Sequence, residues 1–525
     1  MIRVWRFGCK RYTIFLFELV SIFKVIMRAI VIGSTKHFLF AAFYGALGIG
    51  LALIITAVWL LNARPNLSLW HTTHLTSEYH QQSGLTDFSQ YLQLEDKLFA
   101  EVEQQVYRQY QPEIASPVNR YERNSLSDPG LWQQNWNRSF EWKNPQAEFG
   151  LLLLHGMSDS PYVMSHFAQH YQHQAYVLGL RLPGHGTIPS GLTDITWPDL
   201  AGAVSLAVAR LSAQLPGKPI YVAGFSTGAA LALNHELENI SLNKPTSFAG
   251  MIMLSPAIGL APIAAGAYWQ AKLGKLLGQD KLYWNSIQTE YDPFKYRSFA
   301  VNAGDVVYQL TQRNQTLLAS LSAQQFNAIP AMLTFQSVVD DTVSSLAVVD
   351  LLYQKLPINK GHQLVLFDVN RTKSNNQLLF QDPLATFAPF WLPKQLPYRL
   401  SLVENDPQQD NHVQVRELAD KSKTDDVIAL SLTWPNDVYS LSHVALNFPI
   451  EDSLYGPLPS NDPDKIQIGR AIYQGERGIF SVTADDMLRQ KWNPFYPYMM
   501  TRIDEFTQGY QPESPLGNKP LNISH

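Results

Sequence analysis

Residues 222–228, Val-Ala-Gly-Phe-Ser-Thr-Gly, place a serine between two glycines directly after an apolar run. This G-x-S-x-G pattern is typical of a nucleophile elbow, a sharp turn from a strand into a helix that exposes a reactive serine. Gly224 and Gly228 lack a Cβ atom and would let the helix pass close to the strand. The Ala-rich residues 229–233 favour that helix. The pattern predicts Ser226 as a nucleophile, and the alternative is a glycine-rich turn without chemistry.

Short apolar runs alternate with stretches of helical periodicity, such as 162–171 and 200–215. Runs of this kind are expected for strands that are buried on both faces of a parallel sheet. The alternation therefore predicts an α/β class fold with a doubly wound, mostly parallel sheet. The expected strands are 149–154, 175–180, 220–223, 249–254, 331–335 and 363–367.

Two stretches interrupt the alternation. Residues 256–328 are mostly helical in pattern, which is expected for a helical lid inserted above a sheet edge. Residues 370–437 are polar and rich in loop signals, with strand candidates only at 398–403 and 427–432. No function follows from this second excursion.

Several motifs occur together in a fixed order, and they resemble the α/β-hydrolase superfamily. The similarity is greatest to the group of monoacylglycerol lipases, lysophospholipases and bacterial carboxylesterases, which is sometimes classed with the serine aminopeptidases. It covers about residues 140–446 and implies the α/β-hydrolase fold, but no particular substrate. The motifs are 151–162 (LLLLHGMSDSPY), 179–187 (GLRLPGHGT), 196–200 (TWPDL), the 222–228 turn and the pair Ser442-His443.

An elbow serine needs a base and an acid that orients the base, and in this superfamily the acid and then the histidine follow the serine. Asp340 lies in the loop after the expected strand 331–335, at the strand end where open α/β sheets keep reactive groups. We predict Asp340 as the acid, with Asp341 as the alternative. Whichever of the two is not used would be a solvated loop carboxylate.

His443 is the predicted base because it follows the last expected strands. His362 and His412 are the alternatives. His362 begins an expected strand at the wrong edge for a base that must reach Ser226. His412 lies in a charged loop that is expected to be exposed to solvent.

The resemblance also implies an oxyanion hole. In α/β-hydrolases one backbone N–H comes from the loop after the strand that here spans 151–154, and the other comes from the residue after the nucleophile. Met157 and Thr227 are therefore the predicted oxyanion donors. His155 is expected to stabilise its loop without transferring a proton, and His185 is expected to border the site at most.

Residues 38–61 are apolar throughout, carry no charge and are long enough to cross a hydrocarbon core of about 30 Å. We expect a transmembrane helix, because a cleaved signal peptide would be shorter and followed by a small-residue cleavage pattern. Seven Lys and Arg residues precede this segment and only Arg64 follows it closely. This bias predicts a cytoplasmic N-terminus and an extracytoplasmic catalytic domain, on the periplasmic side of a bacterial inner membrane.

Residues 13–32 are also apolar but contain three charged residues. We expect an interfacial helix there, or a true start at Met27 instead of Met1, rather than a second span that would reverse the orientation. The expected domains are a basic N-terminal segment (1–37), the transmembrane helix (38–61), a tether with an amphipathic helix (62–138), the α/β-hydrolase domain (139–449) and a C-terminal extension packed on it (450–525).

Composition excludes some classes of function. A net charge of −4 over 525 residues gives no electrostatic reason to expect nucleic acid as a partner. The single cysteine, Cys9, cannot build a disulfide framework or a cysteine-based metal site. No phosphate-binding loop, H-E-x-x-H helix or dinucleotide fingerprint occurs in the sequence, so no cofactor and no metal are implied.

These features predict a membrane-anchored serine hydrolase that cleaves carboxylic esters through an acyl-enzyme intermediate. Acylglycerols and lysophospholipids are candidate substrates, because an anchored enzyme meets lipids. Two alternatives stay open: an amide or peptide hydrolase of the serine aminopeptidase type, and a catalytically inactive α/β-hydrolase fold that serves as a binding module of the cell envelope. The sequence does not indicate the oligomeric state.

Overall fold

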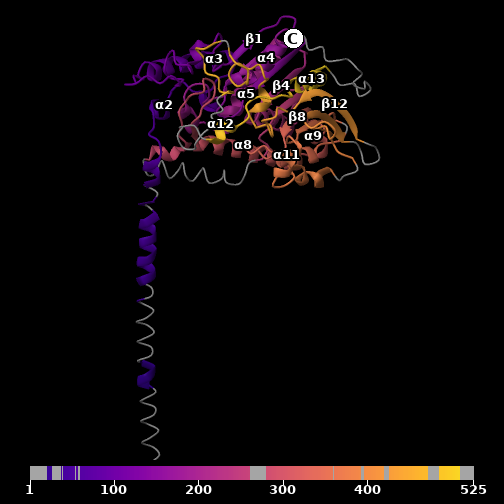
Figure 1. The fold of residues 1–525 in the computed structure, drawn as a ribbon. Helices are drawn as coiled ribbons and strands as arrows, with labels where there is room; N and C mark the ends of the chain where they lie inside the picture. The colour runs from indigo at the N-terminus through magenta and orange to yellow at the C-terminus, as the bar shows by residue number, and fades with distance from the viewer. Residues whose placement is uncertain are drawn as a thin grey trace, which may run out of the picture. The chain divides into compact units, whose positions relative to one another are not determined.

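The computed structural model describes residues 21–25, 37, 40–53, 55–56, 59–259, 279–358, 360–391, 395–418, 425–460, 462–470 and 484–508. The chain divides into two compact units, Met1–Pro65 and Asn66–His525. Figure 1 shows the chain, coloured along its length from the N-terminus to the C-terminus.

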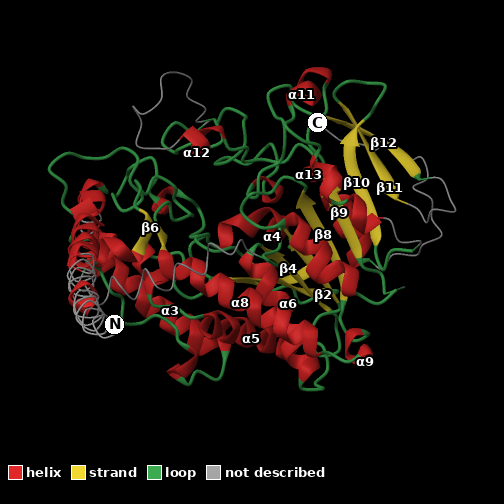
Figure 2. Cartoon of the chain, turned by 90° about the horizontal axis from the view of Figure 1, so that it is seen from below, coloured by secondary structure: helices red, strands yellow, loops and turns green. Residues whose placement is uncertain are grey.

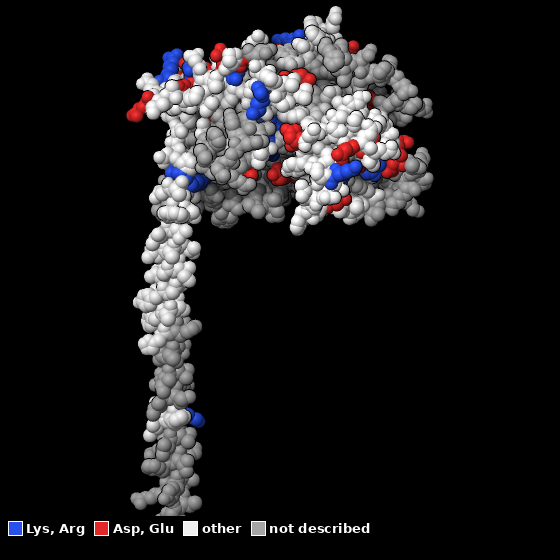
Figure 3. Space-filling model, viewed as in Figure 1, with Lys and Arg blue, Asp and Glu red and all other residues white. Residues whose placement is uncertain are grey.

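The first unit is helical at residues 21–25, 40–53, 55–56 and 59–63. Its described residues from 40 to 63 carry no charge, and Figure 3 draws them white. Within the described part of the chain, no helix combines the length and the apolarity that crossing a membrane requires. The span predicted at 38–61 includes residues 38, 39, 54, 57 and 58, which lie outside the described residues, as does most of the predicted interfacial helix at 13–32.

The second unit is built on a ten-stranded sheet with helices on both faces (Figure 2). The strand order is β1-β3-β2-β4-β5-β8-β9-β10-β11-β12. Neighbours from β3 to β10 pair in parallel, and β1, β11 and β12 pair antiparallel to their neighbours. The predicted mostly parallel α/β sheet is confirmed. Its strands are β1 (Phe140–Trp142), β2 (Phe149–Leu154), β3 (Ala175–Leu180), β4 (Ile220–Phe225), β5 (Gly250–Leu254), β8 (Ala331–Ser337), β9 (Gln363–Phe367), β10 (Arg399–Asn405), β11 (His412–Leu418) and β12 (Asp426–Thr433).

Strand β2 shows why the central strands are apolar throughout. Successive side chains of a strand point to opposite faces of the sheet. Leu152 and Leu154 enter the core beneath α5, α6 and α8, whereas Leu151 and Leu153 enter the core beneath α4 and α13. Both faces are covered, so each position must be apolar. The helices are α2 (Leu69–Thr72), α3 (Phe88–Val102), α4 (Ser165–Tyr171), α5 (Trp197–Gln214), α6 (Thr227–Ser241), α8 (Val301–Ser320), α9 (Ala323–Phe326), α10 (Ser345–Ala347), α11 (Lys373–Leu378), α12 (Ala484–Leu488) and α13 (Tyr496–Thr507).

Residues 370–437 extend the sheet. The strand candidates at 398–403 and 427–432 correspond to β10 and β12, and β11 lies between them. Strand β11 was missed because the expected strands were identified from continuous apolar runs, although its alternation of apolar and polar residues is also a strand signal. Val413 and Val415 are buried, while Gln414 and Arg416 reach Glu404 on β10, at 3.0 and 2.9 Å.

The prediction that 256–328 is a mainly helical lid is wrong for the described residues 279–300. These residues form a 3₁₀ turn (Asp280–Tyr283) and a small hairpin of β6 (Trp284–Ser286) and β7 (Phe299–Ala300). Asp292 precedes a proline and accepts the backbone N–H groups of Phe294 and Lys295, at 3.0 and 3.1 Å, which favours a turn over a helix. Residues 260–278 lie outside the described residues.

Helix α8 packs beside α6 on one face of the sheet. Oδ1 of its Asn314 accepts a hydrogen bond from the side-chain amide of Asn234 at 2.9 Å, and Nδ2 of Asn314 donates to the carbonyl of Ala230, also at 2.9 Å. Arg313 pairs with Glu238 at 2.7 Å. These contacts make α8 a layer of the fold, although its first turns border the site described below.

Segments on either side of the sheet domain are held to it by buried ionic and polar contacts. Glu95 on α3 pairs with Arg181 just after β3, at 3.0 Å, and both side chains are almost fully buried. On α13, the Arg502 guanidinium donates to Ser401 at 3.1 Å and to Gln363 at 2.6 Å, on β10 and β9. The amphipathic helix expected in 62–138 corresponds to α3.

Candidate active site

The turn from β4 into α6 has the geometry expected of a nucleophile elbow. Ser226 lies between them with φ 51° and ψ −113°, a backbone conformation that costs energy for a residue with a side chain. A Cβ atom on Gly228 would lie 2.4 Å from the carbonyl oxygen of Leu154 and 2.6 Å from that of His155. Glycine at this position therefore lets α6 pass across the end of β2.

Asp340 and His443 form a buried pair. The Nδ1 atom of His443 lies 2.8 Å from Oδ2 of Asp340, and the carboxylate side chain is fully buried. The other carboxylate oxygen accepts the backbone N–H groups of Thr342 and Val343, at 2.9 and 3.1 Å. Burial acts to raise the pKa of Asp340, but attraction to His443 and these hydrogen bonds outweigh it, so the pKa lies below its ordinary value. The carboxylate is ionised and can orient the imidazole.

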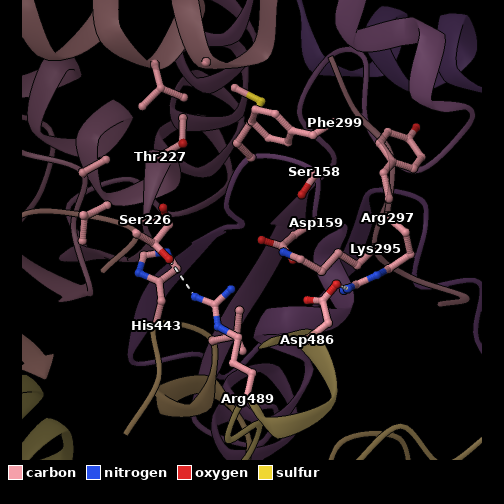
Figure 4. A pocket seen from close by; sticks show the side chains of 18 of the residues that line it. Ser158, Asp159, Ser226, Thr227, Lys295, Arg297, Phe299, His443, Asp486 and Arg489 are labelled. Atoms are coloured by element: carbon pink, nitrogen blue, oxygen red, sulfur yellow. Dashed lines mark hydrogen bonds and ion pairs between the residues drawn. The ribbon is translucent and has the colours of Figure 1, made fainter. Parts of the chain in front are cut away.

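The imidazole of His443 lies at the elbow. Its ring centre is 4.8 Å from that of Phe225, the residue before Ser226. Ser226 and His443 line the same cavity of about 340 Å³, where Figure 4 shows them beside each other. The residues predicted as nucleophile, acid and base thus follow β4, β8 and β12, respectively, and lie close together.

The alternatives lie elsewhere. The side chain of Asp341 is 91% exposed and lies 3.7 Å from Arg489, and it does not line the cavity. His362 is buried at the start of β9, with no hydrogen-bond partner for either ring nitrogen in the described part of the chain. His412 is exposed at the start of β11. Neither histidine lines the cavity.

The predicted oxyanion residues also line the cavity. Thr227 is the first residue of α6, so its N–H has no acceptor within the helix. Met157 lies in the loop after β2 and lines the same cavity. Both residues are therefore at the cavity, and their role as donors to an oxyanion stays a prediction.

His155 fixes the loop that carries Met157. Its Nε2 atom accepts the N–H of Leu182 at 2.9 Å, and its Nδ1 atom donates to the carbonyl of Gly156 at 2.8 Å. Burial, reinforced by the nearby His185, holds the pKa of His155 well below its ordinary value. His155 is thus neutral with both nitrogens engaged, while His185 is buried behind it and does not line the cavity.

The cavity has an apolar wall and a charged wall that the sequence analysis missed. Single charged residues in separate segments carry no periodic or motif signal, and the sequence predicts only that the C-terminal extension packs on the hydrolase domain. Figure 4 shows how these charged side chains converge. The apolar wall includes Met157, Ala257, Phe299, Val307, Val343 and Val444, and the charged wall includes Asp159, Lys295, Arg297, Asp486 and Arg489. Among the described residues, no group of three or more His, Cys, Asp or Glu side chains could hold a metal ion.

Comparison with known proteins identifies related sequences and folds. Residues 151–397 match the family model described as Alpha/beta hydrolase family. The thermostable monoacylglycerol lipase of Bacillus sp. (strain H-257) is 29% identical over 129 residues, which are 24% of this chain and 48% of that protein. The chain thus spans about half the length of this curated relative.

Two solved structures of lipolytic enzymes are also similar. A structure from a study of LipS and LipT, two metagenome-derived lipolytic enzymes, is 17% identical, with 49% of this chain and 97% of that chain covered and a TM-score of 0.34. The monoacylglycerol lipase of Paleococcus ferrophilus is 14% identical, with 44% of this chain and 88% of that chain covered and a TM-score of 0.33.

Alanine substitutions at two helix glycines should change the free energy of unfolding in opposite directions, because only Gly228 lies at the close contact of the elbow. Gly228→Ala should lower the free energy of unfolding by about 1–3 kcal/mol, because the new Cβ overlaps the two carbonyl oxygens at the end of β2. Gly304→Ala in α8 should raise it by up to about 1 kcal/mol, because there a Cβ meets only the Phe299 ring at 3.9 Å. Urea unfolding of both variants measures the difference. Equal changes would show that α6 can move away from β2 without cost.

Proposed function

We propose that this chain is a serine hydrolase of the α/β-hydrolase type that cleaves carboxylic esters, because residues 151–397 match the model of that family. The observation that carries this proposal is the buried Asp340–His443 pair, packed on the elbow residue Phe225 in the cavity that Ser226 lines. A nucleophile, a base and an orienting acid are the groups that acyl transfer needs. The named relatives are lipases, and they favour neither the peptidase nor the binding-module alternative.

The proposed reaction runs in two halves. The Ser226 hydroxyl attacks the ester carbonyl while Nε2 of His443 takes its proton, and Asp340 keeps the other ring nitrogen protonated. The N–H groups of Met157 and Thr227 hold the oxyanion. His443 then gives the proton to the leaving alcohol, and the acyl group stays on Ser226. In the second half, His443 takes a proton from water, which attacks the acyl group, and then returns the proton to the Ser226 oxygen.

The substrate would place its acyl group on the apolar wall. Phe299, Val307 and Val444 offer an apolar surface beside Ser226, and acyl chains gain about 0.8 kcal/mol for each methylene group buried. We propose a lipid ester of the acylglycerol or lysophospholipid type, in line with the monoacylglycerol lipase to which residues of this chain are similar.

Ser226→Ala should abolish covalent labelling by a fluorophosphonate probe and lower kcat for p-nitrophenyl esters by at least about 10³-fold, because the attacking oxygen is lost. Labelling is read by intact-protein mass, and turnover by release of nitrophenol. Ser205→Ala, on the outer face of α5, is the matched control and should behave as the parent. Labelling of the Ser226→Ala protein would refute the assignment of the nucleophile.

The two neighbouring aspartates provide a second comparison. Asp340→Asn should lower kcat/KM by about 10⁴-fold, because an amide no longer fixes the imidazole tautomer. Asp341→Asn removes the same charge at the neighbouring residue. Because the Asp341 side chain is exposed, this change should alter kcat/KM only a few-fold. Steady-state kinetics on one ester measures both variants. A larger loss for Asp341→Asn would reverse the assignment of the acid.

The localisation proposal rests on the N-terminal sequence, its uncharged residues 38–61 and the basic residues before them. We propose that this segment anchors the chain in a bacterial inner membrane with the hydrolase unit on the periplasmic side. The full chain should then stay with membranes during alkaline carbonate extraction, whereas residues 66–525, a compact unit, should be released. Release of the full chain by carbonate would disprove the anchor.

A further inference from the structure

The charged wall of the cavity comes from three segments that are far apart in the sequence, and Asp159 in the loop after β2 supplies one carboxylate. Lys295 and Arg297 precede β7, and Asp486 and Arg489 lie in or just after α12, in the C-terminal extension. Figure 4 shows the Arg489 side chain reaching into the cavity between His443 and Asp486. An oriented cation beside the proposed base is a feature that ester hydrolysis itself does not require.

Three cations, Lys295, Arg297 and Arg489, are among the described residues that line the cavity. Two of them form ion pairs with carboxylates that also line it. Lys295 pairs with Asp159 at 2.5 Å, and the Arg297 guanidinium pairs with Asp486. All four of these side chains are largely buried. Among the described residues that line the cavity, three are cations and two are carboxylates, which leaves one positive charge unmatched within this described lining.

Arg489 supplies this excess charge. Its Nη2 atom donates to the hydroxyl of Thr342 at 2.7 Å, and Asp341 lies 3.7 Å away. The Asp341 side chain is 91% exposed, so water and salt screen its attraction for the guanidinium. The remaining N–H groups of Arg489 can meet a bound ligand.

The turn that carries Arg489 is held firmly beside the proposed base. Ser442, the residue before His443, donates to the carbonyl of Gln490, the residue after Arg489. The Lys491 ammonium donates to the carbonyls of Asp486 and Arg489, at 2.9 and 3.1 Å. These contacts attach the backbone of Arg489 to the loop of His443 and keep its guanidinium in the region of the proposed base.

We propose that Arg489 binds an anionic group, a phosphate or a carboxylate, that the ester substrate carries in its alcohol part. A guanidinium presents paired N–H donors that match the oxygens of both groups. The acyl chain would then lie on the apolar wall and the anionic head on the charged wall, with the scissile carbonyl at Ser226 between them. This inference rests on the proposed ester hydrolysis and names the substrate class within it.

Three esters with the same acyl chain test the proposal: neutral 1-hexanoylglycerol, 1-hexanoylglycerol 3-phosphate and the hexanoyl ester of glycerate. At low ionic strength the parent protein should have a higher kcat/KM for at least one anionic ester than for the neutral one. Arg489→Gln should lower this ratio about tenfold, mainly through KM, because a hydrogen bond between charged groups is lost. Arg489→Lys should retain part of the preference.

A matched control removes the same charge elsewhere. Arg108→Gln changes a guanidinium that is mostly exposed and pairs with Glu103 at 3.5 Å, away from the cavity lining, and should leave the ratio unchanged. An equal loss in both variants would show that only the overall charge matters and would overturn the proposal. An unchanged ratio in Arg489→Gln would overturn it as well.

Binding to the Ser226→Ala protein separates this proposal from the proposed function. Calorimetry with the three esters should show tighter binding of an anionic ester, and the added Arg489→Gln change should remove the difference. Such binding without turnover by the parent would refute ester hydrolysis and keep the anion site. Turnover by the parent with no Arg489-dependent preference would refute the anion site alone. Faster hydrolysis of the neutral ester on addition of inorganic phosphate would assign the site to a free anion and overturn the assignment to the substrate.

Discussion

The passage of α6 across the end of β2, with no room for a Cβ at Gly228, is the constraint on which the site depends. The contact brings the first turn of the helix against the carbonyls of Leu154 and His155. Ser226 has its strained conformation two residues before this contact, between strand and helix. Thr227 and Met157 line the cavity beside it. The proposed nucleophile and the proposed donors to the oxyanion of a bound ester thus lie together where the helix crosses the strand.

The other two proposed catalytic residues lie far from Ser226 in the sequence. Asp340 and His443 are separated by 103 residues, and the sheet adds β9 to β12 between them. The excursion that the sequence left without a function therefore has a structural role, since it lengthens the sheet before the chain returns with the histidine. The C-terminal extension then binds the histidine loop through Ser442 and places Arg489 beside it. Ser442, His443 and Arg489 lie outside the segment that matches the family model, which ends at residue 397.

Local features of the sequence predicted the sheet and the meeting of Ser226, Asp340 and His443, because each has a signal in its own neighbours. The apolar strands are covered on both faces, and the elbow needs glycine where the backbone is crowded. The hairpin of β6 and β7 was missed because the apolar spacing of 256–328 resembles a helix, and the turn made by Asp292 outweighs it. The charged wall could not be predicted at all. Lys295 and Arg489 are ordinary polar residues in sequence and become a group only when the fold brings them together.

The separation of the site along the chain also has a consequence for its biosynthesis. Ribosomes make the chain from the N-terminus, and domains fold as their residues emerge. The elbow with Ser226 is complete long before His443 exists, and Arg489 follows later still. An unfinished chain would hold a serine without its base, next to an apolar surface without its charged wall. Because α13, near the end of the chain, covers one face of the sheet, neither this core nor the meeting of Ser226 with His443 can be complete until the last segments have been made.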